Sequence, residues 1–284
     1  MPGLHPNVVI VGATGAIGSA TAGVLANRGA RLWLLARPSD RLDALVDRLQ
    51  SDQRVSSVPV DLSVSASVRT AARELSKETR QIDALIISAV TWVPDHRFTP
   101  DGFELMAATN QLGPFLLTNL LRDRLTGGGR VIIVAAPSST RFVPADLLFK
   151  DENPRRTPSP TFRAWRTFGA TKAANLMFAF ELARRAKRWD VRVNAYHPGI
   201  VRSEMNREMP RLVRLAARIM SRSPDRAAQD LYELSLSPAF DGTTGWFFKG
   251  TRRIDPPRST LDLDAQRALW MTSAEAVELG SAGF

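Results

Sequence analysis

The stretch VGATGAIGSA (residues 11–20) lies between an apolar run and an amphipathic segment. Three of its glycines, Gly12, Gly15 and Gly18, have the spacing G-x-x-G-x-x-G. Glycine lets the chain turn sharply from a strand into a helix and approach a pyrophosphate, which the helix N-terminus then holds. At the start of a series of strands and helices the stretch predicts a dinucleotide-binding turn; taken alone, it also fits an ordinary strand-to-helix turn.

The rest of the chain supplies that series, because short apolar runs alternate with amphipathic segments. Strands that are apolar throughout and separated by helices predict an α/β fold, here a Rossmann-like, doubly wound parallel sheet of six strands with helices on both faces. We expect strands at 8–12, 31–36, 55–61, 83–89, 130–136 and 191–199, and helices at 18–29, 40–50, 65–79, 103–125 and 168–187.

The 284 residues contain no linker, repeat or low-complexity tract, so we expect a single domain over 1–284. Residues 1–136 would form a dinucleotide-binding half, and 137–284 would carry the substrate loop, the catalytic helix and a lid. The stretch 137–166 has no regular periodicity, and a loop of that length inside a compact domain is usually functional. It leaves the carboxyl end of the fifth strand, where this architecture binds ligands.

Composition excludes several classes of function. The chain has no cysteine, and its three histidines lack metal-ligand spacing, so we expect no disulfide and no metal site. No apolar run is long enough for a membrane span and no signal peptide precedes the first strand, so we expect a cytoplasmic protein. The net charge is +10, but the arginines are scattered, which argues against nucleic acid as a partner. One cluster is an exception: Arg155, Arg156, Arg163 and Arg166.

Two residues at strand ends predict how a dinucleotide is held. Asp61 follows the third strand and is suited to accept a hydrogen bond from the adenine amino group; the alternative is a plain helix N-cap. Arg37 ends the second strand, where an acid would hold the ribose 2′-hydroxyl of NAD and an arginine suits the 2′-phosphate of NADP. Arg41 could assist. The alternative for Arg37 is a surface charge.

These segments resemble the short-chain dehydrogenase/reductase family, and within it the retinol-dehydrogenase-like branch. The resemblance covers nearly the whole chain and implies an NADP(H) site. It is carried by GATGAIG (12–18), LLAR (34–37), VDLS (60–63), TNQLGPFLLTNLL (109–121), GRVIIV (129–134), ATKAANLMFAFELARR (170–185), VNAYHPGIVRSEM (193–205) and GWFFKG (245–250). The implied cofactor-binding residues are Gly12, Thr14, Gly15, Ala16, Ile17, Gly18, Arg37, Asp61, Leu62, Ala89, Lys172, Pro198, Gly199 and Val201.

The catalytic set departs from that family, which uses Asn, Ser, Tyr and Lys. Asn110 and Lys172 match, but the serine position is Ala136 and the tyrosine position is Phe168. In the family the tyrosine donates a proton to the carbonyl oxygen, the serine binds the same oxygen, and the lysine lowers the tyrosine pKa and holds the nicotinamide ribose. Phe168 and Ala136 can do neither donor task, and a positioned general acid is typically worth ~10²–10⁴-fold in rate. Ser138 could restore a hydroxyl.

Other proton donors are few. The chain has two tyrosines, of which Tyr196 ends the sixth strand and Tyr232 lies in an expected helix far from the site. His197 could in principle act as an acid. For each of these residues the alternative is a structural role.

Three hypotheses of function remain open. The first is an NADP(H)-dependent oxidoreductase whose hydride goes to an activated C=C bond or an imine, so that the tyrosine acid is not needed. The second is a non-redox enzyme, such as a cyclase, dehydratase or isomerase, with polar residues of the 137–166 loop carrying the chemistry; these are Asp146, Asp151, Glu152 and the arginine cluster. The third is a binding protein without catalysis.

The expected partner is an apolar or aromatic small molecule, because several aromatic residues fall in loops that should surround the site. They are Trp92, Phe98, Phe142, Phe162, Trp165 and Phe168. Residues 212–222 follow the Pro-Gly turn where relatives have a mobile lid, although an amphipathic segment could equally touch a membrane surface. The resemblance also implies a possible homodimer or homotetramer through the helices at 103–125 and 168–187.

Overall fold

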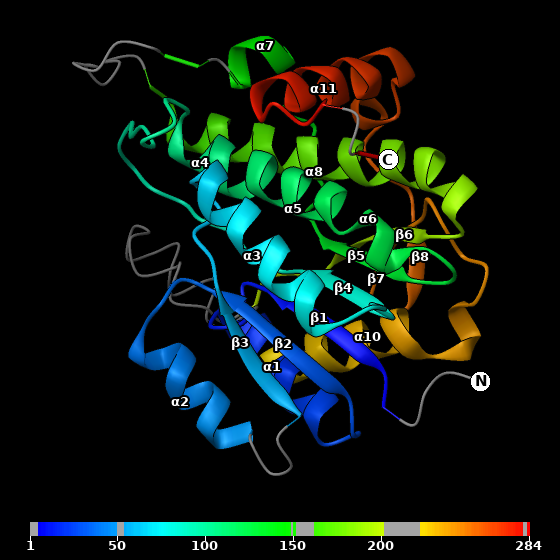
Figure 1. Ribbon diagram of the computed structural model, residues 1–284. Coiled ribbons are helices and arrows are strands. Elements are labelled where there is room, and N and C mark those ends of the chain that lie inside the picture. The colour runs from blue at the N-terminus through cyan, green and yellow to red at the C-terminus, as the bar shows by residue number, and fades with distance from the viewer. Residues whose placement is uncertain (1–4, 50–53, 149, 152–161, 202–221, 281–282) are drawn as a thin grey trace.

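The computed structural model describes residues 5–49, 54–148, 150–151, 162–201, 222–280 and 283–284. They form an α/β fold built on one eight-stranded sheet with the order β3-β2-β1-β4-β5-β6-β7-β8 (Figure 1). All neighbouring strands are parallel except β7 and β8. The strands are β1 (Asn7–Val11), β2 (Arg31–Ala36), β3 (Val55–Pro59), β4 (Ala84–Ile87), β5 (Arg130–Val134), β6 (Arg192–His197), β7 (Phe247–Lys249) and β8 (Arg252–Ile254).

The six expected strands are confirmed, and the expectation of only six is wrong. Strands β7 and β8 extend the sheet as a short hairpin around Gly250, whose φ is +64°. Each has three residues, which is too short for a periodic pattern to stand out. The edge strand β8 begins with two exposed arginines, and charge on an edge strand discourages pairing with another chain.

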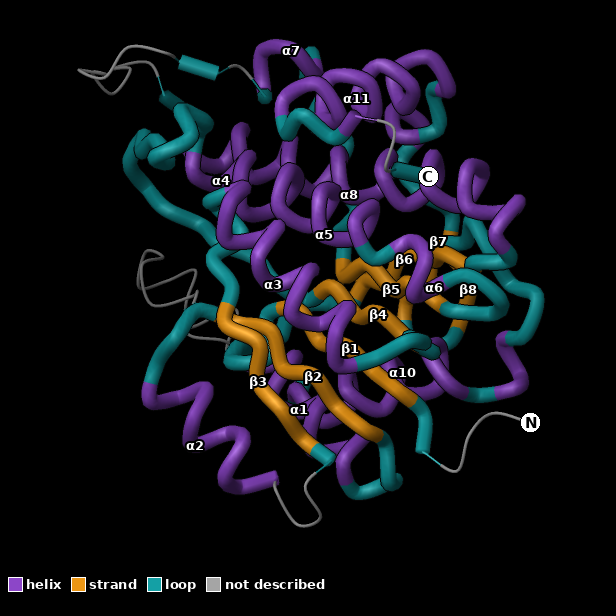
Figure 2. The backbone as a smooth tube through the Cα atoms, in the orientation of Figure 1, coloured by secondary structure: helices purple, strands orange, loops and turns teal. Residues whose placement is uncertain are grey.

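Helices cover both faces of the sheet, as Figure 2 shows. The first strand explains why, because its successive side chains enter two different cores: Val9 and Val11 pack on one side, and Val8 and Ile10 on the other. The first side is covered by α3 (Ser65–Glu78), α5 (Gly113–Leu120) and α8 (Ala164–Ala186), and the second by α1 (Ala16–Ala26), α2 (Asp40–Leu49) and α10 (Pro224–Leu236).

The helix expected at 103–125 is not continuous. It consists of α4 (Leu105–Ala107), a π-helical turn (Ala108–Leu112), α5 and α6 (Arg122–Leu125). The wider turn contains Asn110, whose side chain bonds the backbone of Thr91 on a neighbouring segment. A single π-turn within a helix is frequent at functional sites and has no strong sequence signature.

Two further boundaries differ from expectation. Helix α8 begins at Ala164, so Phe168 lies inside its first turns rather than at its start. The stretch 137–166 contains the short helix α7 (Pro144–Leu147), followed along the chain by residues outside those described. A proline at the first position of α7 fixes the backbone angle that a helix start requires.

The C-terminal helix α11 (Leu263–Ala276) packs against α8 and α7 (Figure 1). The Trp270 ring contacts Phe115 of α5 and Phe178 of α8, with centroids 4.9 Å and 6.0 Å away. Part of the outer surface of α5 and α8 is therefore covered by the chain itself. A homo-oligomer through these helices stays a prediction.

Two absences hold for the described part of the chain. None of its helices has both the length and the apolar composition needed to cross a lipid bilayer. No group of three or more His, Asp or Glu side chains there is arranged to hold a metal ion.

Arg130 connects the sheet to the end of α10, and its replacement is expected to destabilise the fold. Its guanidinium is buried, donates to the Ser237 carbonyl at 2.8 Å, and pairs with Asp241. Arg130→Met would leave the Ser237 carbonyl and the Asp241 carboxylate without this donor, so we expect the free energy of unfolding to fall by about 1–3 kcal/mol. Arg267→Met, which removes an exposed pair on α11, should cost less than about 1 kcal/mol. Equal losses in chemical denaturation would contradict this role of Arg130.

Candidate active site

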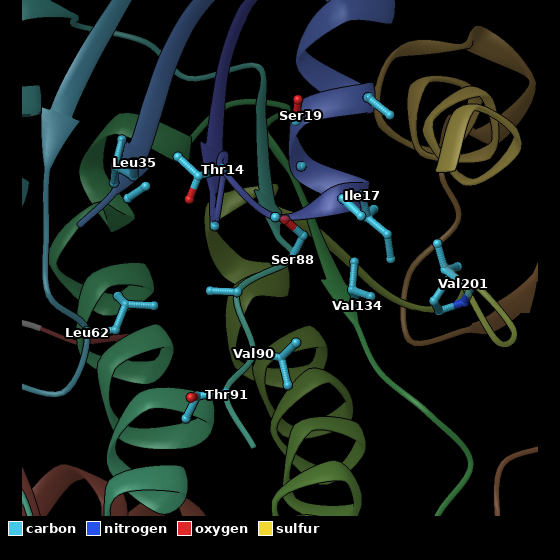
Figure 3. Close-up of a pocket in the computed structure, with 18 of the residues that line it drawn as sticks. Thr14, Ile17, Ser19, Leu35, Leu62, Ser88, Val90, Thr91, Val134 and Val201 are labelled. Carbon is cyan, nitrogen blue, oxygen red and sulfur yellow. The ribbon is translucent and has the colours of Figure 1, made fainter. Parts of the chain in front are cut away.

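A cleft of about 1380 Å³ opens at the carboxyl ends of the parallel strands. It lies where the strand order reverses, between β1 and β4, which is the usual ligand position in this architecture. In Figure 3, Ile17 projects from α1 on one side, while Leu62 and Thr91 lie on the other. All the residues expected to bind the cofactor line this cleft.

The glycine loop forms a cradle that a side chain would fill. Gly12 has φ of +85°, and a Cβ atom there would lie 2.6 Å from the Ala89 backbone. A Cβ atom on Gly18 would lie 2.2 Å from the Gly12 carbonyl oxygen. Helix α1 starts with no side-chain cap and no acidic residue in its first turn. Its first N–H groups therefore remain available, and the positive end of the helix dipole suits a pyrophosphate.

Asp61 lines the cleft just beyond β3 and also shapes the backbone there. Its Oδ1 atom accepts hydrogen bonds from the Ser63 backbone N–H at 2.9 Å and the Ser63 hydroxyl at 2.7 Å. The structure is therefore compatible with both roles considered for Asp61, an acceptor for the adenine amino group and a cap of the following turn. One carboxylate oxygen holds the turn, and the other accepts no hydrogen bond from the described residues.

Three arginines line the same end of the cleft. Arg37 is exposed at the end of β2, and Arg41 lies on α2. Arg48, which the sequence did not single out, reaches the cleft from the last turn of α2 and donates to the Ser19 hydroxyl at 3.1 Å. The arginines place positive charge along this part of the cleft, where it would attract an anionic group.

Lys172 and Phe168 lie together at the opposite end of the cleft, and Ala136 also lines it. The Lys172 Nζ atom is 5.4 Å from the centroid of the Phe168 ring and 3.3 Å from the Asn175 Oδ1 atom. Only 8% of Lys172 is exposed. Burial without a compensating charge lowers the pKa of Lys172 to about 8.

Asn110 does not line the cleft but holds one of its walls. Its Oδ1 atom accepts from the Thr91 backbone N–H at 2.7 Å, and its Nδ2 atom donates to the Thr91 carbonyl at 2.9 Å. The Asn175 amide donates to the Asn110 carbonyl at 2.7 Å. A continuous set of hydrogen bonds thus runs from Lys172 through Asn175 and Asn110 to the segment after β4.

The expectation that Ser138 supplies a hydroxyl is not supported by its position. Ser138 does not line the cleft, and its Oγ atom donates to the Gly169 carbonyl at 2.7 Å. A Cβ atom on Gly169 would lie 2.4 Å from the Thr140 hydroxyl, so the Thr140 side chain packs closely against the backbone of α8 here. Ser138 therefore secures the start of α8.

Neither tyrosine lines the cleft. The Tyr196 hydroxyl is buried and donates to Asp230 at 2.8 Å, and Tyr232 lies beneath the Arg28 guanidinium. His197 does line the cleft, but its Nδ1 atom is near the Gly199 N–H at 3.4 Å. Burial lowers the pKa of His197, so the ring is neutral at neutral pH and a weak source of protons.

Of the six aromatic residues expected around the site, two line the cleft and four do not. Trp92 and Phe168 line the cleft, and Trp165 lies against Trp92 with ring centroids 5.1 Å apart. Phe98 and Phe162 instead flank the His96 ring, at 4.5 Å and 4.6 Å. Phe142 packs against the core.

Other expected polar residues are not part of the cleft. Asp146, Asp151, Arg163 and Arg166 do not line it. Glu152, Arg155, Arg156 and most of the predicted lid at 212–222 lie outside the described residues.

Comparisons with known proteins give the family. The family described as "short chain dehydrogenase" matches residues 6–146 and 160–212. Retinol dehydrogenase 13 of Mus musculus is 31% identical over 286 residues, which cover 97% of this chain and 84% of that protein. Retinol dehydrogenase 14 of Homo sapiens is 32% identical over 304 residues, with 98% and 88% covered.

A solved structure of an uncharacterized protein from Mycobacterium paratuberculosis agrees with this fold. It superposes with a TM-score of 0.74 at 29% identity, covering 96% of this chain and 93% of that one. The chain belongs to the short-chain dehydrogenase/reductase family, whose members bind nicotinamide cofactors and act on small molecules, and retinol dehydrogenases are among its relatives.

Proposed function

We propose that the protein is an NADP(H)-dependent oxidoreductase that delivers hydride to an activated C=C bond or an imine of an apolar small molecule. One observation carries the proposal: the glycine loop, Lys172 and Phe168, which we assign to the position of the family's tyrosine, line one cleft. The relatives named after retinol support an apolar substrate, because retinol is itself largely apolar.

The chain's own residues would hold the cofactor along the whole cleft. The N–H groups at the start of α1 would hold the pyrophosphate, Asp61 the adenine and Lys172 the nicotinamide ribose, since all three parts of the chain line the cleft. Arg37 and Arg41 neutralise the 2′-phosphate, which is the basis for proposing NADP(H) over NAD(H). When bound, the reduced cofactor supplies a hydride.

The residues near the reacting carbon limit which functional groups of a substrate can accept the hydride. Phe168 and Ala136 cannot hydrogen-bond an alkoxide, so a simple ketone would develop negative charge without a donor. An enone delocalises that charge, and the enolate formed takes its proton from water. An iminium ion becomes a neutral amine on hydride addition and needs no proton. Phe168, Trp92 and Leu105 give part of the cleft an apolar lining, which favours an apolar ligand.

Neither Tyr196 nor Tyr232 lines the cleft, and this favours a second candidate function, that of a protein without redox turnover. It would be a non-redox enzyme or a non-catalytic NADP(H)-binding protein. The two candidates differ in one result: only the oxidoreductase consumes NADPH in proportion to added substrate. Location in the cytoplasm stays a prediction.

Restoring the family's donors should change the substrates that are reduced. We expect wild-type protein to oxidise NADPH with apolar enones or imines and not with matched ketones. Ala136→Ser combined with Phe168→Tyr should raise ketone reduction by about 10²–10⁴-fold, since it adds a general acid and a hydrogen-bond donor. The change is followed as NADPH absorbance. No turnover of enones or imines by the wild type would contradict the proposal and favour the second candidate.

Arg37 should determine the choice of dinucleotide. Arg37→Ala is expected to weaken NADPH binding by about 10- to 100-fold, the loss of one charge-assisted contact, while NADH affinity changes less than about 3-fold. Arg267→Ala on α11, away from the cleft, is the matched control and should leave both affinities unchanged. Titration by calorimetry measures both. The role assigned to Arg37 would be refuted if Arg37→Ala weakened the binding of NADPH and NADH equally, or if it weakened neither.

Lys172 should make stability depend on pH. Its pKa is about 8 in the folded protein and 10.5 as a free side chain, so the unfolded chain binds more protons between these values. The free energy of unfolding should therefore rise with pH across this window, by up to about 3 kcal/mol, relative to Lys172→Met. Below pH 8 the full cost of burying the charge remains. Denaturation of both proteins without cofactor at several pH values measures the difference; a constant difference would contradict the burial of an unpaired amine.

A further inference from the structure

The Lys172 amine has unusual surroundings for a lysine. Its side chain reaches the cleft, yet only 8% of the residue is exposed. Among the described residues its partners are the neutral Asn175 amide oxygen, at 3.3 Å, and the face of the Phe168 ring. No carboxylate of the described residues forms an ion pair with it. The ammonium form is thus desolvated and uncompensated.

The physical consequence is an amine that loses its proton easily. Burial is the cause of the lowered pKa, with no contribution from a charged side chain. With a pKa of about 8, roughly 10% of the amine is neutral at pH 7, against well under 1% for an exposed lysine. A neutral lysine in an apolar pocket is a nucleophile that forms Schiff bases with carbonyl compounds.

The neighbouring side chains allow a carbonyl compound to approach. The Phe168 ring lies beside the amine, and Ala136 lines the same cleft, so no hydroxyl at either position competes for the amine lone pair. Trp92 and Leu105 extend this apolar lining toward the open side of the cleft. An aldehyde or ketone with an apolar substituent would bury that substituent here.

We propose that Lys172 is a covalent attachment site that captures apolar aldehydes and ketones as an imine when no dinucleotide fills the cleft. The Nζ lone pair attacks the carbonyl carbon, a C–N bond forms, and the carbonyl oxygen leaves as water after taking up two protons, both supplied by the amine nitrogen. The resulting C=N bond joins the ligand to Lys172. No oxidant or reductant takes part, so this chemistry is separate from the proposed hydride transfer and does not depend on it.

The imine can be trapped and located. Protein without dinucleotide is incubated with benzaldehyde and sodium cyanoborohydride near neutral pH, and the benzyl-lysine is mapped by peptide mass spectrometry. We expect Lys172 to be labelled at least about 10-fold faster than the other lysines and with saturation in benzaldehyde, because its neutral fraction is larger. The other lysines are all exposed and serve as internal controls: Lys77, Lys150, Lys187 and Lys249. Labelling of Lys172 no faster than these four would overturn the proposal.

A conservative variant tests whether the lack of a compensating charge causes the fast labelling of Lys172. Asn175→Asp keeps the side-chain shape, gives up the donation to the Asn110 carbonyl and sets a carboxylate beside the amine. The carboxylate should stabilise the ammonium form and slow labelling of Lys172 by about 10-fold or more. Thermal unfolding of the variant checks that it is folded, and labelling of the four exposed lysines should not change. An unchanged rate at Lys172 in folded Asn175→Asp would contradict the role of the uncompensated amine.

Discussion

The close approach of three backbone segments at the glycine loop is the constraint on which the site depends. Side chains at Gly12 and Gly18 would collide with the Ala89 backbone and with the Gly12 carbonyl. Because neither glycine carries a side chain, α1 can start directly beside the turn after β4, at the point where the strand order reverses. The position of α1 and of its first N–H groups at this end of the cleft follows from this contact.

The opposite end of the cleft is built from hydrogen bonds instead of steric contact. Asn110, in its π-helical turn, fixes the segment after β4 through Thr91, and Asn175 links that turn to Lys172. This framework persists around a pair, Phe168 and Ala136, that cannot donate protons. The result is a buried amine beside an aromatic ring. Both proposals rest on it: a hydride acceptor that needs no positioned acid, and a nucleophilic amine.

Much of the fold and of the cleft could be predicted from the sequence, because both depend on patterns of residues that are close together in the chain. The apolar strands, the glycine spacing and residues at strand ends such as Arg37 and Asp61 have fixed positions in a doubly wound sheet. The features that could not be predicted from the sequence depend on contacts between distant parts of the chain or on elements too short to show a pattern. Arg48 reaches the cleft only because α2 lies along α1, Ser138 is turned away by its bond to Gly169, and β7 and β8 are too short to show a period. The cover that α11 provides for α8 comes from packing that no local pattern contains.

The central claim is that a working nicotinamide site can lack its tyrosine acid. Transfer of deuterium from C4-deuterated NADPH to an apolar enone tests it most directly, because the position of the label in the product reports which atom received the hydride. The account predicts deuterium on the β-carbon, with a solvent proton on the α-carbon and the carbonyl intact. Deuterium on the carbonyl carbon, giving an allylic alcohol, would contradict it by requiring a proton donor poised at the oxygen.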